Sequence, residues 1–265
     1  MIVVKLGGSI LREEIHDFYA DLRDHVMRRK VILVHGGSDT VDEVAERMGV
    51  EQKFIVSPSG FRSRHTDKSM IGIYQMAVAG RVNKDLVARL QRFGINAIGL
   101  SGMDGSLVKA RRKKKIKSVE GDGIRTIVDD YSGRITRVDS RLLKSLLSLN
   151  YLPVLAPLAI SENFEPLNVD GDRLAASVAG AVGAERLVIF TDVPGVLLKG
   201  ELVSQMRTGE VKEMIRAVEA GMKKKLYAAS EALNLGVKEV IIRSVFGERP
   251  LTSALRHEEC TVIRG

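Results

Sequence analysis

The stretch IVVKLGGS at residues 2–9 joins a short apolar run to a pair of glycines, and KVILVHGGS at 30–38 repeats this arrangement. Short apolar runs that end at glycine turns are typical of buried β-strands, so we expect strands over residues 2–5 and 30–34. The apolar residues that follow the first run share one face of a helix: Ile15, Phe18, Tyr19, Leu22 and Val26. The chain therefore begins with a strand, a helix and a second strand.

The same alternation of strand and helix patterns continues along the chain. Four further apolar runs predict strands over residues 96–100, 151–156, 187–191 and 239–243. Helical stripes are formed by Val41, Val44, Ala45 and Met48, by Leu86, Val87 and Leu90, and by Leu142, Leu143, Leu146 and Leu147. Strands separated by helices form mainly parallel sheets that are covered on both faces. We therefore expect an α/β fold, a three-layer αβα sandwich around an open, mainly parallel central sheet.

Residues 113–138 interrupt this alternation with a period-two pattern. The turn residues GDG at 121–123 and YSG at 131–133 predict β-hairpins, inserted at an edge of the α/β body. No low-complexity linker divides the chain into separate units. We therefore expect a single domain, with an N-terminal lobe over 1–155 and a C-terminal lobe over 156–265 that meet over a cleft at the carboxyl ends of the strands.

The composition excludes several classes of protein. With 265 residues, of which 45% are hydrophobic and 28% charged, the chain can bury an ordinary core and is not intrinsically disordered. No run of 18 uncharged apolar residues is present, and Lys5 falls too early for a signal peptide, so we expect a cytoplasmic protein with no membrane partner. Cys260 is the single cysteine and the five histidines are scattered, so neither a disulfide nor a structural metal site is expected.

The charge balance favours a negatively charged ligand or partner. Lys and Arg number 41 against 33 Asp and Glu, a formal net charge of +8. Seven of the nine residues at 109–117 are basic, a run that suits a solvated face, nucleic acid or an acidic protein. With no tryptophan and 5% aromatic residues, the chain has few of the stacking side chains that proteins use to bind single-stranded nucleic acid.

The glycine pairs Gly7-Gly8 and Gly36-Gly37 are candidate anion-binding turns. Glycine lets backbone N–H groups approach phosphate or carboxylate oxygens at the start of a helix, although each pair alone is more often a tight strand-to-helix turn. Lys5 ends the first strand, where its ammonium group must reach solvent or an anion such as phosphate. The sequence contains neither GxGxxG nor GxxxxGK followed by Ser or Thr, which disfavours the Rossmann and Walker types of nucleotide site.

Polar residues gather where two other predicted elements meet. Asn168, Asp170 and Asp172 precede an alanine-rich helix. One acid is enough to cap that helix, which leaves the other polar groups free to orient cations or lysines in a cleft. Thr191 and Asp192 follow the predicted strand at 187–191, where they suit either a nucleotide contact or a plain turn.

Basic residues in two further segments are candidates for anion binding. GMKKKL at 221–226 begins a helix, and the helical turn of about 100° per residue allows only one of its three lysines to face a cleft. Arg62 and Arg64 stand in the loop SPSGFRSRHTD at 57–67. A guanidinium group there suits either bidentate capture of a carboxylate or simple exposure to solvent.

These motifs follow one another along the chain as KLGGS, VHGGS, RSRHTD, GRVNKDLV, GLSGMDG, NVDGD, TDVPGVL and GMKKKL. In this order and at these spacings they resemble the amino acid kinase family over nearly the whole chain. The resemblance implies a kinase that uses ATP and Mg²⁺ to convert a carboxylate into an acyl phosphate. It also implies that the N-terminal lobe binds the substrate, that the C-terminal lobe binds the nucleotide, and that the protein is a homodimer. A carboxylate acceptor is already an anion and needs no general base.

The resemblance also implies roles for individual residues. Lys5 corresponds to the lysine that contacts the transferring phosphoryl group, Lys225 to a second lysine on the nucleotide side, and Asp172 to the aspartate that organises both. The implied substrate-binding residues are Gly36, Gly37, Ser38, Arg64 and Asn168. The implied nucleotide-binding residues are Gly7, Gly8, Thr191 and Asp192. The resemblance implies no catalytic role for Asp170. It also implies no metal ligand among the protein side chains.

Two subgroups of the family are most similar to this sequence: N-acetylglutamate kinases, and kinases of α-aminoadipate or glutamate attached to the amino-group carrier protein LysW. The block PSGFRSRHTD and the basic charge favour the carrier-linked substrate, because such carriers are small and acidic. The expected docking residues are Arg62, Arg111, Arg112, Lys113, Lys114 and Lys115. Aminoadipate and glutamate differ by one methylene, too little for the sequence to separate them. A non-catalytic binder of nucleic acid or other anions is disfavoured, because Lys5, Asp172 and Lys225 are all present.

Overall fold

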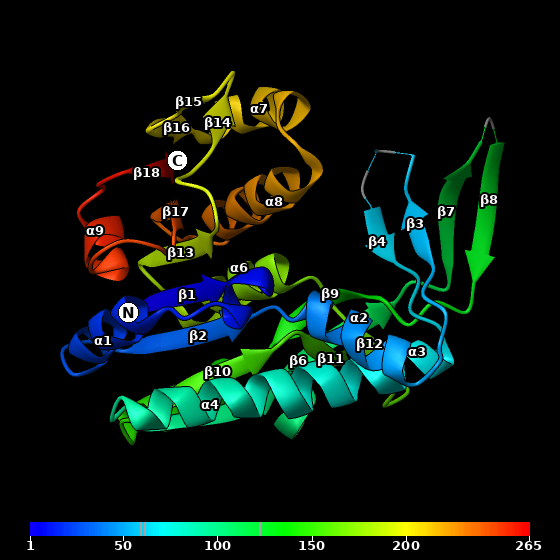
Figure 1. Cartoon of the computed structure of the whole chain (residues 1–265), viewed down its shortest axis with the longest axis horizontal. Coiled ribbons are helices and arrows are strands. Elements are labelled where there is room, and N and C mark those ends of the chain that lie inside the picture. Colours follow the sequence, from blue (N-terminus) through cyan, green and yellow to red (C-terminus); the bar gives the residue numbers. More distant parts are fainter. Residues whose placement is uncertain (59, 61, 122) are drawn as a thin grey trace.

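The computed structural model describes residues 1–58, 60, 62–121 and 123–265, and its centre is an open β-sheet (Figure 1). Within the described residues this sheet has eight strands. Their order across the sheet is β16 (Gln205–Arg207), β18 (Cys260–Arg264), β17 (Glu239–Ser244), β13 (Arg186–Thr191), β1 (Ile2–Leu6), β2 (Val31–His35), β10 (Leu152–Ala156) and β5 (Ala97–Ser101). All run parallel except β18 and its neighbour β16, which run opposite to the rest.

The six strands predicted from sequence all belong to this sheet, and each lies within one residue of its predicted bounds. The predicted α/β fold with an open, mainly parallel sheet is therefore confirmed. β1 is central: Lys5 lies opposite Val34 of β2 on one side and Ile189 of β13 on the other. The carboxyl ends of β1, β2 and β13 consequently meet at one edge of the sheet. The segments that follow these three strands are brought together there.

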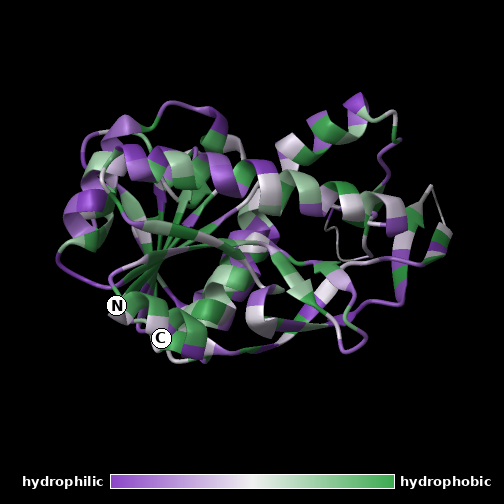
Figure 2. Ribbon diagram, turned by 90° about the horizontal axis from the view of Figure 1, so that it is seen from below, coloured by the Kyte–Doolittle hydropathy of each residue, from purple (hydrophilic) through white to green (hydrophobic). Residues whose placement is uncertain are grey.

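Helices cover both faces of the sheet and complete the predicted three-layer sandwich, in which Figure 2 shows hydrophobic strands between two helical layers. One face is covered by α1 (His16–Val26), α4 (Asn83–Arg92) and α9 (Pro250–Leu255). The other is covered by α5 (Ser140–Ser148), α6 (Gly171–Val182) and α8 (Ala220–Asn234). Strand residues alternate between the two cores: Ile2 and Val4 pack into the first and Val3 into the second.

The remaining helical elements join these layers. They are η1 (Ser9–Arg12), α2 (Ser38–Arg47), α3 (Lys68–Tyr74), η2 (Gln75–Val82), η3 (Asp104–Ser106), η4 (Thr208–Glu210) and α7 (Val211–Ala217). α3, η2 and α4 follow one another without a break and form one long helix, whose middle part, η2, is π-helical. α2 packs against η2. The start of α2 is therefore held beside the long helix.

Smaller β-elements extend the molecule beyond the carboxyl ends of the central strands (Figure 1). One sheet contains β12 (Pro166–Asn168), β11 (Leu158–Ile160), β6 (Val108–Arg112) and β9 (Gly133–Val138), in that order. The hairpins are β3 (Phe54–Val56) with β4 (Arg62–Arg64), β7 (Lys115–Glu120) with β8 (Gly123–Val128), and β14 (Leu197–Leu198) with β15 (Glu201–Leu202). The first two hairpins contact each other through β3 and β7, and both project away from the central sheet.

The inserted β-structure is only partly as predicted. The hairpin expected around GDG corresponds to β7 and β8, although Asp122 itself lies outside the described residues, as do Ser59 and Phe61 of the loop at 57–67. The hairpin expected at YSG is wrong, because β9 pairs with β6 and not with β8. The backbone N–H of Tyr131 donates to the Thr66 carbonyl at 2.6 Å, which ties this segment to the β4 region and turns the chain away from β8.

Candidate functional site

The two glycine turns lie against each other at the carboxyl ends of β1 and β2. A Cβ added to Gly8 would stand 2.6 Å from the backbone nitrogen of Gly37, and one added to Gly36 would stand 2.7 Å from that of Gly8. Both distances are far shorter than van der Waals contact, and the obstructing atoms belong to the backbone. The turns can therefore pack this closely only with glycine at these positions, whatever ligand approaches their N–H groups.

Lys5, Asp172 and Lys225 meet beside these turns. The Lys5 ammonium lies 2.6 Å from Asp172 Oδ1, and both side chains are only 7% exposed. The Lys225 ammonium lies 3.9 Å from Asp172 Oδ2. Two cations from opposite ends of the chain thus share one buried carboxylate, which leaves an excess of positive charge next to the glycine turns.

The start of α6 explains why Asp172 is available for the two lysines. Asp170 is the residue that caps the helix: its Oδ1 accepts hydrogen bonds from the backbone N–H groups of Asp172 and Arg173, both at 3.0 Å. The Asp172 carboxylate is not used for capping and faces Lys5 instead. Of the two acids at this helix start, Asp170 therefore serves as the cap and Asp172 is left for the site.

The charges around this carboxylate shift the pKa values of Asp172 and Lys225. Burial acts to raise the pKa of Asp172, but the ammonium groups of Lys5 and Lys225 outweigh it and hold that pKa below its usual value. Burial lowers the pKa of Lys225, and the nearby Lys5 adds to this effect, whereas the Asp172 carboxylate opposes it. Asp172 is therefore ionised at neutral pH, and it favours the charged form of Lys225.

Arg173 holds the helix that carries Lys225. Its Nε donates to Glu231 Oε2 at 2.9 Å, and its Nη2 bonds the other carboxylate oxygen, Oε1. Arg173 lies next to Asp172 on α6, and Glu231 lies on α8 with Lys225. Because the pair is bidentate, it fixes the orientation of α8 relative to α6 as well as their separation.

Arg64 reaches the glycine turn that follows β2. Its Nη2 lies 2.5 Å from Asp42 Oδ1 and donates to Ser38 Oγ at 3.0 Å, while the residue as a whole is 7% exposed. Its other terminal nitrogen, Nη1, is buried and has no hydrogen-bond partner among the described residues. Buried guanidinium groups rarely leave a donor unused, so this nitrogen suits an oxyanion bound at the turn.

Asn168 is joined to the β4 segment by a short hydrogen-bond chain. Its Nδ2 donates to Thr66 Oγ1 at 3.0 Å. The backbone N–H of Thr66 donates to Asp130 Oδ2 at 3.0 Å, and the fully buried Asp130 also accepts from the backbone N–H of Ser132 at 2.6 Å. Thr66 and Asp130 were not among the predicted site residues. Their partners are distant in sequence, so no local pattern indicates this arrangement.

His35 and Asn83 are two further buried polar residues that the sequence analysis did not select. Asn83 Nδ2 donates to the Val154 carbonyl and to His35 Nε2, both at 3.0 Å. Because Nε2 accepts this hydrogen bond, the His35 proton resides on Nδ1. The Nδ1–H group donates to the Gly36 carbonyl at 2.6 Å. Burial lowers the pKa of His35 to about 4. The available signal was a histidine that ends an otherwise apolar strand directly before a glycine pair.

This neutral histidine makes stability depend on pH. Between about pH 6.5 and 4 the unfolded chain binds a proton at residue 35 that the folded chain does not, so the free energy of unfolding falls by about 1.4 kcal/mol per pH unit as the pH is lowered. We expect His35→Gln to flatten this part of the curve, measured by urea unfolding at several pH values. Exposed His16→Gln is the control; the same pH slope in wild type and His35→Gln contradicts the prediction.

Thr191 and Asp192 end β13 beside β1, on the side of the sheet edge nearest Lys225. The Thr191 hydroxyl donates to Asp192 Oδ1 at 3.0 Å. The Asp192 carboxylate acts on Lys225 by raising its pKa, a weaker effect than that of Asp172. Glycine turns, lysines and this strand end therefore border the same region.

The basic run at 109–117 is not uniform. Arg112 is engaged within the protein: it stacks on Tyr131 at 3.5 Å from the ring centroid and forms ion pairs with Asp129 and Glu165 at 2.6 and 2.8 Å. The exposed members of the expected docking set are Arg62, Arg111, Lys113, Lys114 and Lys115. Arg62 stacks on Phe54 of the adjacent strand, 3.8 Å from the ring centroid. Arg112 therefore does not contribute a free charge to this surface.

The described residues lack the side-chain groupings of a metal centre and the helices of a membrane span. No group of three or more His, Cys, Asp or Glu side chains is arranged to hold a metal ion in that part of the chain. No helix in it combines the length and apolar character needed to cross a bilayer. The Asp172 carboxylate already contacts two ammonium groups. Their positive charge disfavours the binding of a metal cation by that side chain alone.

Comparison with known proteins identifies the relatives of this arrangement. The pattern of the amino acid kinase family matches residues 1–244. A protein of Nitrosopumilus maritimus is 44% identical over 264 residues, 99% of each chain; it is provisionally named as a LysW-aminoadipate/LysW-glutamate kinase. Proteins of Saccharolobus islandicus with that name are 39% identical over 267 residues, 100% of each chain. The solved structure of smu.665 from Streptococcus mutans superimposes with a TM-score of 0.81 at 25% identity and covers 99% of this chain and 98% of its own.

Proposed function

This chain belongs to the amino acid kinase family, and we propose that it transfers the γ-phosphoryl group of ATP to the side-chain carboxylate of α-aminoadipate or glutamate attached to the carrier protein LysW. The product is an acyl phosphate, an intermediate of lysine or arginine biosynthesis. The observation that carries the proposal is the meeting of Lys5 and Lys225 on Asp172, beside two glycine turns. Names of full-length relatives supply the substrate class.

The charges of the site suit this reaction. The attacking carboxylate is already ionised, so the main obstacle is repulsion between an anion and the triphosphate. Lys5 lies next to the glycine turns, where its ammonium offsets charge on the transferring phosphoryl group. Lys225 lies on the other side of Asp172, where it would offset charge on the leaving β-phosphate. Asp172 favours the charged form of Lys225, and its contacts hold both ammonium groups in place.

Mg²⁺ would reach this site as part of the nucleotide complex. The ion typically keeps several waters and binds to substrate phosphates with one or two carboxylates. Among the described residues the chain offers no ready-made set of three ligands, so the phosphates would supply most of the coordination. When bound, the ion supplies further neutralisation of phosphate charge.

The two lobes would divide the substrates between them. On the N-terminal side, residues 1–155, the turn Gly36-Gly37-Ser38 and Arg64 surround the position proposed for the amino acid. Asn168 reaches the same side from β12 through Thr66. On the C-terminal side, residues 156–265, Thr191, Asp192 and Lys225 border the position proposed for the nucleotide, with Gly7 and Gly8 between the two.

Arg64 provides a test of the substrate side. Arg64→Lys keeps the positive charge but loses the second guanidinium nitrogen, so we expect the KM for the amino-acid substrate to rise about tenfold with a smaller change in kcat. Initial rates at saturating ATP measure both quantities. Arg92→Lys, on the exposed face of α4, is the control. An unchanged KM in Arg64→Lys removes this residue from the substrate site.

The carrier would dock on the projecting hairpins and the basic run beside them. Arg62, Arg111, Lys114 and Lys115 are exposed there, and the surface suits a small acidic protein. Lys113 is exposed on the same run, and the charges of Arg173 and Asp170 at the start of α6 act on it in opposite directions.

Neutralising the docking charges should affect the carrier more than the nucleotide. In Lys114→Gln/Lys115→Gln we expect kcat/KM for the carrier-linked substrate to fall about three- to tenfold at low salt, with less effect at high salt and no change in the KM for ATP. Lys144→Gln/Lys212→Gln, two exposed lysines elsewhere, is the matched control. Equal losses for carrier and nucleotide would contradict a docking role.

A hydroxylamine trap tests the function directly, because hydroxylamine converts an acyl phosphate into a stable hydroxamate. With ATP and Mg²⁺, the substrates to compare are LysW-linked glutamate, LysW-linked aminoadipate, free N-acetylglutamate and the unloaded carrier. We expect hydroxamate from the carrier-linked amino acids. Turnover of N-acetylglutamate alone would identify an N-acetylglutamate kinase instead, and no hydroxamate from any substrate would reject the kinase proposal.

The family resemblance further suggests a homodimer. Light scattering coupled to size-exclusion chromatography measures the mass in solution. A mass near twice that of one chain is the expected result, and the mass of a single chain would contradict it.

A further inference from the structure

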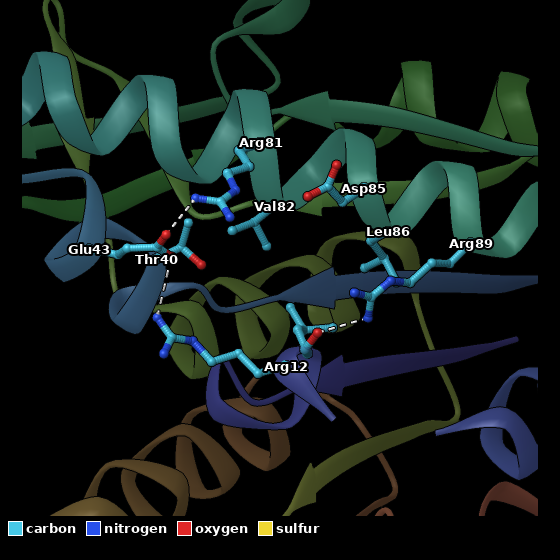
Figure 3. A pocket seen from close by; sticks show the side chains of 9 residues that line it. Arg12, Thr40, Glu43, Arg81, Val82, Asp85, Leu86 and Arg89 are labelled. Carbon is cyan, nitrogen blue, oxygen red and sulfur yellow. Dashed lines mark hydrogen bonds and ion pairs between the residues drawn. The ribbon is translucent and has the colours of Figure 1, made fainter. Parts of the chain in front are cut away.

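A cavity lies between η1, α2 and the junction of η2 with α4 (Figure 3). Its volume is about 300 Å³, large enough for a small metabolite. Its lining includes Leu11 and Arg12 from η1, and Arg81 and Arg89 from the long helix. None of the groups assigned above to phosphoryl transfer lines it, so this cavity is separate from the proposed kinase site.

The cavity has more basic than acidic side chains. Arg12, Arg81 and Arg89 line it together with two acids, Glu43 and Asp85. The carboxylate of Glu43 is divided between several guanidinium groups: Arg81 lies 3.2 Å from it and Arg12 lies 3.8 Å from it. Arg47, from outside the cavity, contacts the same carboxylate at 2.8 Å. Glu43 therefore cannot fully neutralise the arginines that line the cavity.

The arginines are held in place by bonds that leave most of their donors unused. Arg12 donates to the Asp39 carbonyl at 2.8 Å, and Arg89 donates to the Leu11 carbonyl at 2.8 Å. A guanidinium group has five N–H donors, so these bonds orient Arg12 and Arg89 but satisfy only a small part of their capacity. Figure 3 shows Arg81 and Arg89 reaching the cavity from the long helix and Arg12 from the opposite side.

We propose that this cavity binds a small molecule that carries a carboxylate or phosphate group, with Arg12 and Arg81 as its principal contacts. Two guanidinium groups from different elements can grip one oxyanion, and Val82 and Leu86 provide an apolar wall for the rest of the molecule. The ligand would bridge η1 and the long helix. Because η1 directly follows Gly7 and Gly8, it would bind next to the proposed phosphate-binding turn without occupying it.

Calorimetric titration tests the site with inorganic phosphate and succinate as separate probes, which distinguishes a phosphate from a carboxylate preference. Saturating non-hydrolysable ATP analogue and Mg²⁺ first block the kinase site, and Lys5→Met provides a second background in which that site is impaired. We expect one saturable binding event for at least one probe in both backgrounds. No saturable binding of either probe by the wild-type protein would overturn the proposal.

Variants on two elements identify the arginines that bind. Arg12→Gln and Arg81→Gln should each weaken binding by at least about tenfold, the loss expected for one charge-assisted hydrogen bond. Arg92→Gln, an exposed arginine on α4 that does not line the cavity, should bind as the wild type does. Circular dichroism checks that all variants are folded. Unchanged binding in both Arg12→Gln and Arg81→Gln would place the anion elsewhere and overturn the assignment.

Discussion

Replacing Lys5 by methionine should lower kcat for acyl-phosphate formation by about 10²–10³-fold, the usual cost of removing one preorganised charge that stabilises a transition state. Methionine keeps the length and apolar stem of the side chain, so the strand and the turn after it should remain intact. Without this ammonium, the transferring phosphoryl group loses the lysine proposed to offset its charge, and Lys225 remains on the side of the leaving phosphate. Steady-state rates of hydroxamate formation measure the effect.

The structure offers a matched control for this substitution. Lys144→Met changes an exposed lysine on α5, remote from the glycine turns, and should retain the wild-type rate. Thermal unfolding of both variants separates loss of function from loss of fold. A Lys5→Met enzyme that turns over within a few-fold of wild type would exclude Lys5 from phosphoryl transfer. Among the described residues, Lys5 is the cation closest to Asp172, so no nearer group could replace it.

Asp172→Asn should also lower kcat by about 10²–10³-fold, through its effect on the two lysines. The amide removes the negative charge that separates Lys5 from Lys225, so the ammonium groups repel each other without compensation. The substitution also changes the pKa of Lys225. The carboxylate raises the pKa of Lys225 against the effect of burial, so its removal lowers that pKa further.

The pH profile distinguishes this mechanism from simple damage to the site. The alkaline limb of kcat/KM reports ionisation in the free enzyme, and it should lie at lower pH in Asp172→Asn than in wild type. Asp17→Asn, at an exposed position in the first turn of α1, should leave both rate and profile unchanged. A limb that stays in place, or moves to higher pH, would show that Asp172 does not control Lys225.

Much of the fold could be predicted because its signals are local. Apolar runs such as VILV at 31–34 and LVIF at 187–190 are short, bounded by turns and separated by helical stripes, so they predict parallel strands without tertiary information. Antiparallel β18 could not be recognised in this way. Its direction is set by pairing with β17, a long-range contact that has no sequence pattern of its own.

The site shows the same division between local and distant information. Capping by Asp170 or Asp172 could be predicted because it involves only the next few residues, and the structure assigns it to Asp170. The Arg173–Glu231 pair was not foreseen, because its partners are 58 positions apart and ion pairs of this kind carry no local signature. Arg112 was misplaced among the docking charges for the same reason: its partners Asp129 and Glu165 are visible only in the folded chain.

Because the two glycine turns are in contact, finding these glycines in a related gene does not show that its product transfers phosphoryl groups. An added Cβ at Gly8 or Gly36 would strike main-chain atoms, which no compensating substitution nearby can remove. Lineages that keep the architecture but lose phosphoryl transfer should therefore retain Gly8 and Gly36. Active members are better recognised by the charged trio on β1, α6 and α8, which has no comparable steric reason to persist.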